Sequence, residues 1–354
     1  MNGTIGSGPV MQPSGLLGLL TNESAAIKSK LDVLTGQASS GMVANTYAGL
    51  GAQASIALDL RPELQAIGTW QHNVSNAGTR LSLTQSALQQ LSDIATNFAN
   101  QTLNMSLQTS QGINAIATQA QAALQQVRAI LNTQTGNNYL FSGQDSANPP
   151  LTGSSLAGFV AAVQAPLATL TTGNGVATVT AMLAAANAGS PIAATTVAGR
   201  AMIETGPGQD AATGVVAGQN AYAVQTAPSS TGSYVKDLIA GLAGLAAISG
   251  GQTATGSDFT TVTTSIGTRL RGAVSALSDE MAGVGQQQAQ MTTQTTMLGN
   301  LSTVLTTQIS AVENVDMATT AAALTQVQNQ LQASYQLISR IHGLSLTAFL
   351  VPGG

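Results

Sequence analysis

Residues 312–350, VENVDMATTAAALTQVQNQLQASYQLISRIHGLSLTAFL, decide the fold of this chain of 354 residues. Small or apolar side chains recur there at alternating spacings of three and four, at Leu324, Val327, Leu331, Ser334, Ile338 and Ile341. This alternation is the spacing of the seam between two paired helices. The segment is therefore predicted to be a long helix that packs along a partner helix.

The other end of the chain offers that partner. Residues 14–38 predict an amphipathic helix, because spacings of three and four separate Leu16, Leu19, Glu23, Ile27, Leu31, Leu34 and Ala38. Helical periodicity resumes from Ala52 to Phe98, with Pro62 near its start, where a first helical turn tolerates proline. A break is expected near Asn104, and a further helix is expected over residues 113–131.

The middle of the chain, Gly143 to about Gly256, carries most of the prolines and short apolar runs such as residues 176–179. It predicts a small α+β or mostly irregular domain with short strands and helical pieces at 158–170, 179–187 and 234–248. From Ser257 to residue 312 the helical pattern returns.

The predicted fold class is mainly α: a long antiparallel coiled-coil-like rod of N- and C-terminal helices, with a small central α+β head. The predicted parts are an N-terminal tube helix and loop, N-terminal rod helices, the head, a C-terminal rod helix and a C-terminal tube helix, at residues 1–50, 51–138, 139–256, 257–312 and 313–354.

The composition suits close packing between helices. Apolar residues make up 44% of the chain but aromatic residues only 3%, so Ala, Leu, Val and Ile must form the contacts. Charged residues are 7%, against about 25% in ordinary soluble domains. Neutral amides and hydroxyls avoid like-charge contacts when identical copies pack side by side. The alternative interpretation is a simple compositional preference for Ala, Gln and Thr.

Charge and cysteine content argue against several classes of protein. A net charge of −4, with 10 scattered Lys and Arg, argues against a nucleic-acid partner. The absence of cysteine excludes disulfides and thiolate chemistry. Residues 1–11 lack the basic and apolar regions of a cleaved secretory signal. The longest apolar stretch, residues 238–248, is too short to span a bilayer, so no membrane insertion is expected.

No catalytic, cofactor or metal site is expected. His72 and His342 lie far apart in the sequence, without metal-binding spacing to a carboxylate or a second imidazole. Glu204 and Asp210 in the predicted head are the remote candidates for a glycosidase pair.

Three stretches resemble one family. They are residues 31–41 (LDVLTGQASSG), residues 138–143 (NYLFSG) followed by a Pro-Pro-Leu sequence, and the terminal block 312–350. Together they resemble the flagellin superfamily, and within it the FlgL family of hook-associated proteins. The chain departs from the family pattern in its lead, residues 1–13, and in residues 42–49, which replace a charged, proline-containing stretch.

The resemblance implies a non-enzymatic building block of the bacterial flagellum that joins hook to filament by helical packing. It implies secretion through the flagellar export apparatus, with terminal helices poorly ordered until assembly. The implied partners are copies of the chain in a ring-like homo-oligomer, another hook-associated protein, flagellin and a cytosolic flagellar export chaperone. A filament-forming flagellin is the first alternative, and an enzyme with a catalytic head on a helical stalk is the remote one.

Tyr139 and Phe141 alternate with Leu140, so an extended segment would place both aromatic rings on one face. The residues expected to form assembly or anchoring contacts are Leu31, Leu34, Tyr139, Phe141, Leu324, Val327, Leu331, Tyr335, Ile338, Ile341, Leu344 and Leu346.

Overall fold

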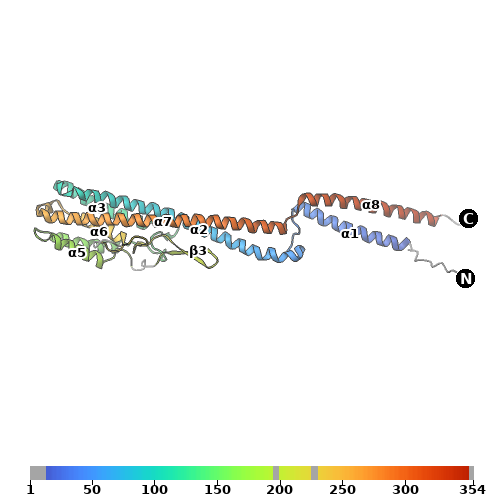
Figure 1. The fold of residues 1–354 in the computed structure, drawn as a ribbon, viewed down its shortest axis with the longest axis horizontal. Helices are drawn as coiled ribbons and strands as arrows, with labels where there is room; N and C mark the ends of the chain where they lie inside the picture. Colours follow the sequence, from blue (N-terminus) through green and yellow to red (C-terminus); the bar gives the residue numbers. More distant parts are fainter. Residues whose placement is uncertain (1–12, 194–198, 225–229, 351–354) are drawn as a thin grey trace. The chain divides into compact units, whose positions relative to one another are not determined.

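The computed structural model describes residues 13–193, 199–224 and 230–350 (Figure 1). The chain forms two compact units. The terminal unit comprises residues 1–66 and 301–354, and the central unit comprises residues 67–300. The five-part division at residues 50, 138, 256 and 312 is finer than these units and stays a prediction.

In the terminal unit, α1 (Pro13–Ser40) pairs with α8 (Met317–Leu350) (Figure 1). The two helices run antiparallel. The hydroxyl oxygens of Ser24 and Ser334 lie 2.6 Å apart, while the backbone N–H of Val315 donates to the carbonyl of Gly41 at 3.0 Å. A short 3-10 helix (Tyr47–Gln53), the start of α2 (Ala54–Leu103) and the end of α7 (Ser257–Glu313) complete the unit.

The seam between α1 and α8 is formed by half-buried and buried side chains on both helices. Their spacing alternates between three and four residues, at Leu20, Ser24, Ile27, Leu31, Leu34 and Ala38 of α1 and at Thr320, Leu324, Val327, Leu331, Ser334, Ile338 and Ile341 of α8. The prediction for the start of α1 was wrong at Leu19 and Glu23, which are exposed. The alternation counted back from Ile27 reaches Ser24 and Leu20 instead. The side chain of Leu16 lies outside the described residues.

The central unit is built on α2 and α7. Asn73 of α2 and Gln294 of α7 donate side-chain hydrogen bonds to neighbouring carbonyls of one strand, and Thr102 packs on Gly267. These contacts show that α2 and α7 run antiparallel. Their buried residues follow the three-four alternation, at Ile67, Val74, Ala77, Leu81, Thr84, Leu88, Leu91, Ala95, Phe98 and Thr102 of α2 and at Val262, Ile266, Leu270, Ala273, Leu277, Glu280, Val284, Gln287, Met291 and Leu298 of α7.

The remaining elements of the central unit surround this pair. A 3-10 turn (Met105–Leu107) ends α2 at the predicted break and leads into α3 (Ser110–Leu131), which packs on α6 (Tyr234–Ala247). A 3-10 segment (Gly250–Thr255) then precedes α7.

The head contains α4 (Gly153–Gln164), a 3-10 helix (Ala165–Thr169) and α5 (Gly175–Ala188). Two antiparallel hairpins are formed by β1 (Gln134–Thr135) with β2 (Asn138–Tyr139) and by β3 (Ala201–Gly206) with β4 (Gln209–Thr213).

The predicted helical pieces at 158–170, 179–187 and 234–248 are confirmed. The apolar run 176–179 belongs to α5 rather than to a strand. The predicted class, mainly helical with a small α+β head, is confirmed.

Two local expectations fail. Pro62 lies inside α2, beyond its first turn, although its missing N–H leaves the carbonyl of Leu58 without its helical partner. Both residues are exposed, so water can bond this carbonyl. Tyr139 and Phe141 do not share one face, because β2 ends at Tyr139 and a turn follows. Leu140 and Phe141 are consequently both buried, whereas Tyr139 is half-buried.

Candidate functional site

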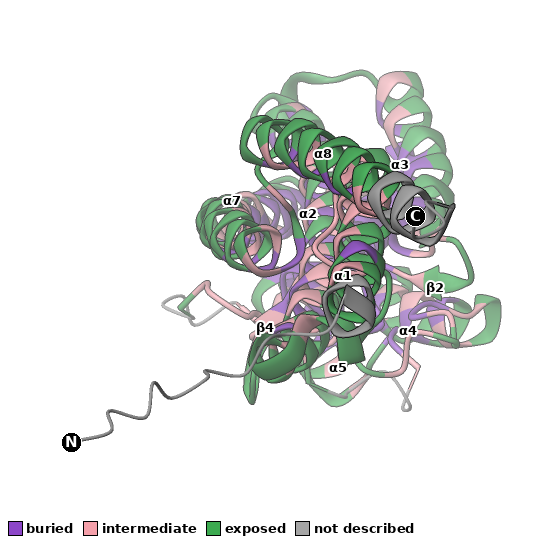
Figure 2. Ribbon diagram, turned by 90° about the vertical axis from the view of Figure 1, so that its right-hand side faces the viewer, coloured by how far each residue is buried: buried purple, intermediate pink, exposed green. Residues whose placement is uncertain are grey.

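The terminal unit leaves much of its apolar surface in solvent. Among its described residues, the buried hydrophobic side chains are Ala57, Leu305, Ile309 and Val327. The large apolar side chains that are exposed define the terminal apolar surface: Leu19, Val33, Tyr47, Ile56, Leu58, Leu301, Val304, Met317, Tyr335 and Leu337. Figure 2 shows that α1 and α8 are exposed over most of their length. Where exposed apolar groups gather into a patch, they are typical of a surface that another protein covers.

The predicted assembly residues fall into three groups. The seam residues Leu31, Leu34, Leu324, Val327, Leu331, Ile338 and Ile341 are brought together between α1 and α8. Tyr335 is 53% exposed and belongs to the terminal apolar surface. Leu344 and Leu346 lie in α8, but their side chains are outside the described part of the chain. Tyr139 and Phe141 belong to the central unit and do not join the α1–α8 seam.

The outer surface of α8 is almost uncharged. Arg340 is its only Asp, Glu, Lys or Arg after the helix start. Asp316 caps that start, because its Oδ1 accepts hydrogen bonds from the N–H of Ala318 at 2.8 Å and of Thr319 at 3.3 Å. These bonds lower the pKa of Asp316. The helix therefore presents neutral Gln, Thr, Ser and Ala around its exposed apolar residues, which suits packing between identical copies.

An ion pair holds the loops where α1 and α8 meet the rest of the terminal unit. The Arg61 guanidinium donates to both carboxylate oxygens of Glu313, at 2.9 and 2.7 Å, and lies 5.8 Å from the centre of the Tyr47 ring. The hydrogen bond to Glu313 raises the pKa of Arg61.

The loop after α1 is tied to the same residue. The backbone N–H of Val43 donates to the Glu313 carbonyl at 2.7 Å, and Gly41 turns the chain with a φ of +73° that favours glycine. Sequence analysis missed this cluster, although the charges of Arg61 and Glu313 stand out in helices that have so few charged residues.

A second polar cluster anchors the head on α7. Glu280 is fully buried at a seam position, and its Oε1 accepts hydrogen bonds from the backbone N–H groups of Ala221, Tyr222 and Ala223 at 2.7 to 3.0 Å. Two turns further along, Gln287 accepts from the N–H of Gly214 at 2.8 Å. These bonds hold the head segment 214–223 against α7. The neighbouring Asp279 is exposed on a different side of the helix, and sequence analysis did not recognise Glu280 as an anchor.

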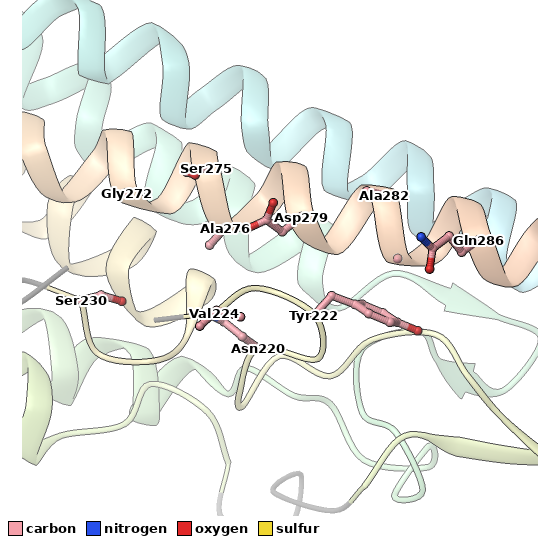
Figure 3. Close-up of a pocket in the computed structure, with 11 residues that line it drawn as sticks. Asn220, Tyr222, Val224, Ser230, Gly272, Ser275, Ala276, Asp279, Ala282 and Gln286 are labelled. Atoms are coloured by element: carbon pink, nitrogen blue, oxygen red, sulfur yellow. The ribbon is translucent and has the colours of Figure 1, made fainter. Parts of the chain in front are cut away.

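Tyr222 fills the space beside this anchor. Its hydroxyl bonds to Gln287 and accepts from Arg200 at 2.6 Å, and its ring packs where a side chain on Gly283 would collide with it. The open groove next to Tyr222 measures about 460 Å³, and Figure 3 shows the Tyr222 ring beside α7. Asp279 is the one charged side chain among the groove's lining residues. The cluster is an anchor for a loop, with no pair of reacting groups in the groove.

The remote catalytic candidates do not line the groove beside Tyr222. Glu204 and Asp210 face each other in register on the β3–β4 hairpin, and both are exposed. Within the described residues, no three His, Cys, Asp or Glu side chains gather as a metal site would require. None of the described helices is long and apolar enough to cross a membrane.

Comparison with known families finds matches toward both ends of the chain. The bacterial flagellin N-terminal helical region matches residues 20–146, and the bacterial flagellin C-terminal helical region matches residues 268–350. Together they cover more than half of the chain. The chain belongs to the flagellin superfamily. It is a structural component of the bacterial flagellum, of a kind that packs with other flagellar subunits.

Individual relatives are distant. Among curated proteins, none matches the chain. Among solved structures, one from Vibrio parahaemolyticus, described as a flagellar hook-associated protein, is similar with a TM-score of 0.41 and 14% identity. The similarity covers 71% of this chain and 96% of that one.

Proposed function

We propose that this flagellin-superfamily chain is the junction protein that joins the hook to the filament. In this role α1 and α8 continue the inner tube of the axial structure, and the central unit meets the neighbouring subunits. One end of each copy would contact another hook-associated protein and the other end would contact flagellin.

The observation that carries the assembly role is the terminal apolar surface. Exposed residues such as Val33, Tyr335 and Leu337 stand on helices whose own seam is already occupied. Their burial between copies would stabilise the assembly by about 25 cal/mol per Å² of apolar area. The exposed apolar residues of α8 also support binding of a cytosolic export chaperone. This chaperone would cover α8 before secretion through the flagellar export apparatus.

The junction role, rather than the filament role, is favoured by the segment where the chain leaves α3 for the head. Residues 138–143 resemble the corresponding segment of the junction proteins, and their packing shows why these residue types suit the position. Phe141 is fully buried, its carbonyl accepts from the N–H of Ala217, and the N–H of Tyr139 donates to the carbonyl of Ser146. A buried aromatic residue thus fixes the head at its point of departure.

A filament-forming flagellin is the second candidate. It is supported by the two matching regions, which are those of bacterial flagellins. A filament protein would need the terminal apolar surface equally, so this surface does not separate the two roles.

Immunogold electron microscopy of intact flagella, with an antibody against residues 143–256, tests the proposal. We expect one cluster of label where hook meets filament. Label along the whole filament would establish the flagellin role instead. Unlabelled flagella, beside a strain lacking the protein as the staining control, would overturn both roles.

A further inference from the structure

A groove of about 460 Å³ in the central unit lies between α2, the turn after β2 and the β3–β4 hairpin. Asn73, Asn76 and Arg80 line it from α2, where spacings of three and four place them on one face. The opposite walls are formed by Gly143, Gln144, Ser146, Ala201, Met202, Ile203 and Thr213. Segments distant in the sequence thus converge on one arginine.

Among the described residues, no ion pair balances the charge of Arg80. The ion pairs among the described residues join Arg61 to Glu313 and Arg269 to Asp237. Arg80 is half-buried, and burial lowers its pKa with no acidic group nearby to raise it again. The undescribed internal segments, 194–198 and 225–229, contain no Asp or Glu. A half-buried guanidinium of this kind is stabilised when an anion enters the groove.

The other lining residues indicate what kind of anion fits. Gln144, Ser146 and Asn76 offer amide and hydroxyl groups, whereas Ala77, Met202 and Ile203 offer apolar surface. A planar guanidinium binds a carboxylate through two parallel hydrogen bonds. The groove therefore matches a carboxylate carried on a short apolar stem, which describes an Asp or Glu side chain.

We infer that the Arg80 groove binds an Asp or Glu side chain of a second copy of this chain. Acidic residues outnumber basic ones, 14 to 10, and exposed carboxylates outside the two ion pairs include those of Asp59, Glu63, Asp93, Glu204, Asp210 and Asp279. A copy packed alongside can therefore supply the missing charge. The inference rests on the proposed function only in requiring that copies pack side by side, and it names one contact of that packing.

Removing the charge of Arg80 tests the contact. Sedimentation velocity of the purified full-length chain would compare Arg80→Gln with Arg271→Gln. Arg271 is exposed on α7 of the same unit, so its variant loses the same charge outside the groove. We expect Arg80→Gln to weaken self-association about tenfold or more and Arg271→Gln to weaken it less than about twofold. Equal self-association of the two variants, both with native circular dichroism spectra, would overturn the inference.

A photo-crosslinking residue at Asn76, which is exposed on the groove wall, identifies the occupant. We expect crosslinked dimers whose partner peptide contains an Asp or Glu, and we expect them to disappear in the Arg80→Gln background. Crosslinks to a different flagellar protein, or dimers that persist without Arg80, would refute a second copy as the source of the carboxylate.

A titration with glucuronate separates a free carboxylate from a protein side chain. Binding that depends on Arg80, together with unchanged self-association of Arg80→Gln, would assign the groove to a soluble acid and overturn the inference. The junction proposal is judged separately, by the position of the immunogold label. If Arg80→Gln chains still assemble and label the junction normally, the groove contact fails while the junction role stands.

Discussion

The two units of this chain share the same helical periodicity, but they bury their seam residues to different extents. In the central unit, the seams of α2 and α7 are buried almost without interruption, and α6 packs on α7 where Gly241 and Gly244 meet Leu270 and Ile266. In the terminal unit, most seam positions of α1 and α8 are only half-buried, and large apolar residues stand exposed on the remaining faces. Spacing alone therefore indicates that a helix has a partner. The number of buried positions indicates whether one partner is enough to cover its apolar residues.

The difference indicates where the stability of each unit originates. Fully buried side chains stabilise the central unit within a single copy. The terminal unit gains less from its two-helix seam, so its helices depend more on contacts with other subunits. The comparison predicts that changes in the terminal unit act on assembly and that changes in the central unit act on the unfolding of the monomer.

Deleting residues 317–350 should have the largest effect on assembly. The deletion removes α8, so α1 loses its seam partner and the terminal apolar surface loses Met317, Tyr335 and Leu337. We expect no incorporation into flagella, whereas the central unit still unfolds cooperatively in a circular dichroism melt. A truncated chain that builds functional junctions would disprove the division of roles between the two units.

Replacing Glu280 by Ala should have the largest effect on the monomer. The change leaves the backbone N–H groups of the three half-buried residues 221–223 without an acceptor. We expect the free energy of unfolding in urea to fall by about 3 kcal/mol. Asp279→Ala, at the exposed neighbouring position, is the control and should change it by less than about 0.5 kcal/mol. If the two variants are equally stable, Glu280 does not anchor the head.

Matched leucine truncations compare the two units directly. Leu88 is fully buried in α2, so Leu88→Ala should lower the free energy of unfolding by about 3 kcal/mol. Leu31 is half-buried in α1, so Leu31→Ala should lower that of the monomer by about 1 kcal/mol or less. Assembly should respond in the opposite order, with Leu31→Ala the more damaging in a sedimentation assay. The same order in both assays would remove the distinction between the units.

Much of this architecture could be predicted from the sequence, because long helices with apolar residues at regular spacings produce a strong pattern. The head helices were predictable for the same reason, whereas residues 176–179 are too few for a period of two to be told from one of 3.6. Leu19 was misplaced because Leu19 and Leu20 both stand at helical distances from Ile27, and only the contact with α8 decides between them.

The polar contacts were the least predictable part. Glu280 and Gln287 continue the three-four alternation of Leu277, Val284 and Met291, but sequence analysis did not place these polar residues on the buried face of α7. Their partners are backbone groups of a loop, and no residue type in residues 214–223 indicates an N–H aimed at a carboxylate. Arg61 and Glu313 are separated by most of the chain, and only the folded structure brings them together.

Replacing Glu313 by Gln should affect the terminal unit locally. The change removes the charge to which Nε and Nη2 of Arg61 donate, while the backbone bond from Val43 to residue 313 remains possible. We expect faster amide hydrogen exchange over residues 41–53, with the midpoint of global unfolding unchanged. Glu63→Gln, at an exposed position of α2, serves as the matched control. Unchanged exchange in Glu313→Gln would mean that the backbone contacts alone hold the loop.

Acid titration of two carboxylates at helix starts should produce the smallest effects, one in each unit. Asp316 caps α8, and Asp258 accepts from the N–H groups of Gly173 and Gly175 at 2.7 and 2.8 Å. Backbone hydrogen bonds lower the pKa of both below the ordinary value of 3.8.

A lowered folded-state pKa means that each carboxylate stabilises the fold above its unfolded pKa, and that this contribution disappears as the pH falls through the folded value. Below pH 3.8 we therefore expect weaker protection of the α8 start and of the 173–175 turn, measured by hydrogen exchange. Asp316→Asn and Asp258→Asn should each abolish this response at their own site only. Because the central unit is held by its buried core, losing the Asp258 contact should leave the rest of that unit protected, whereas fraying at Asp316 should spread along α8 in the unassembled chain.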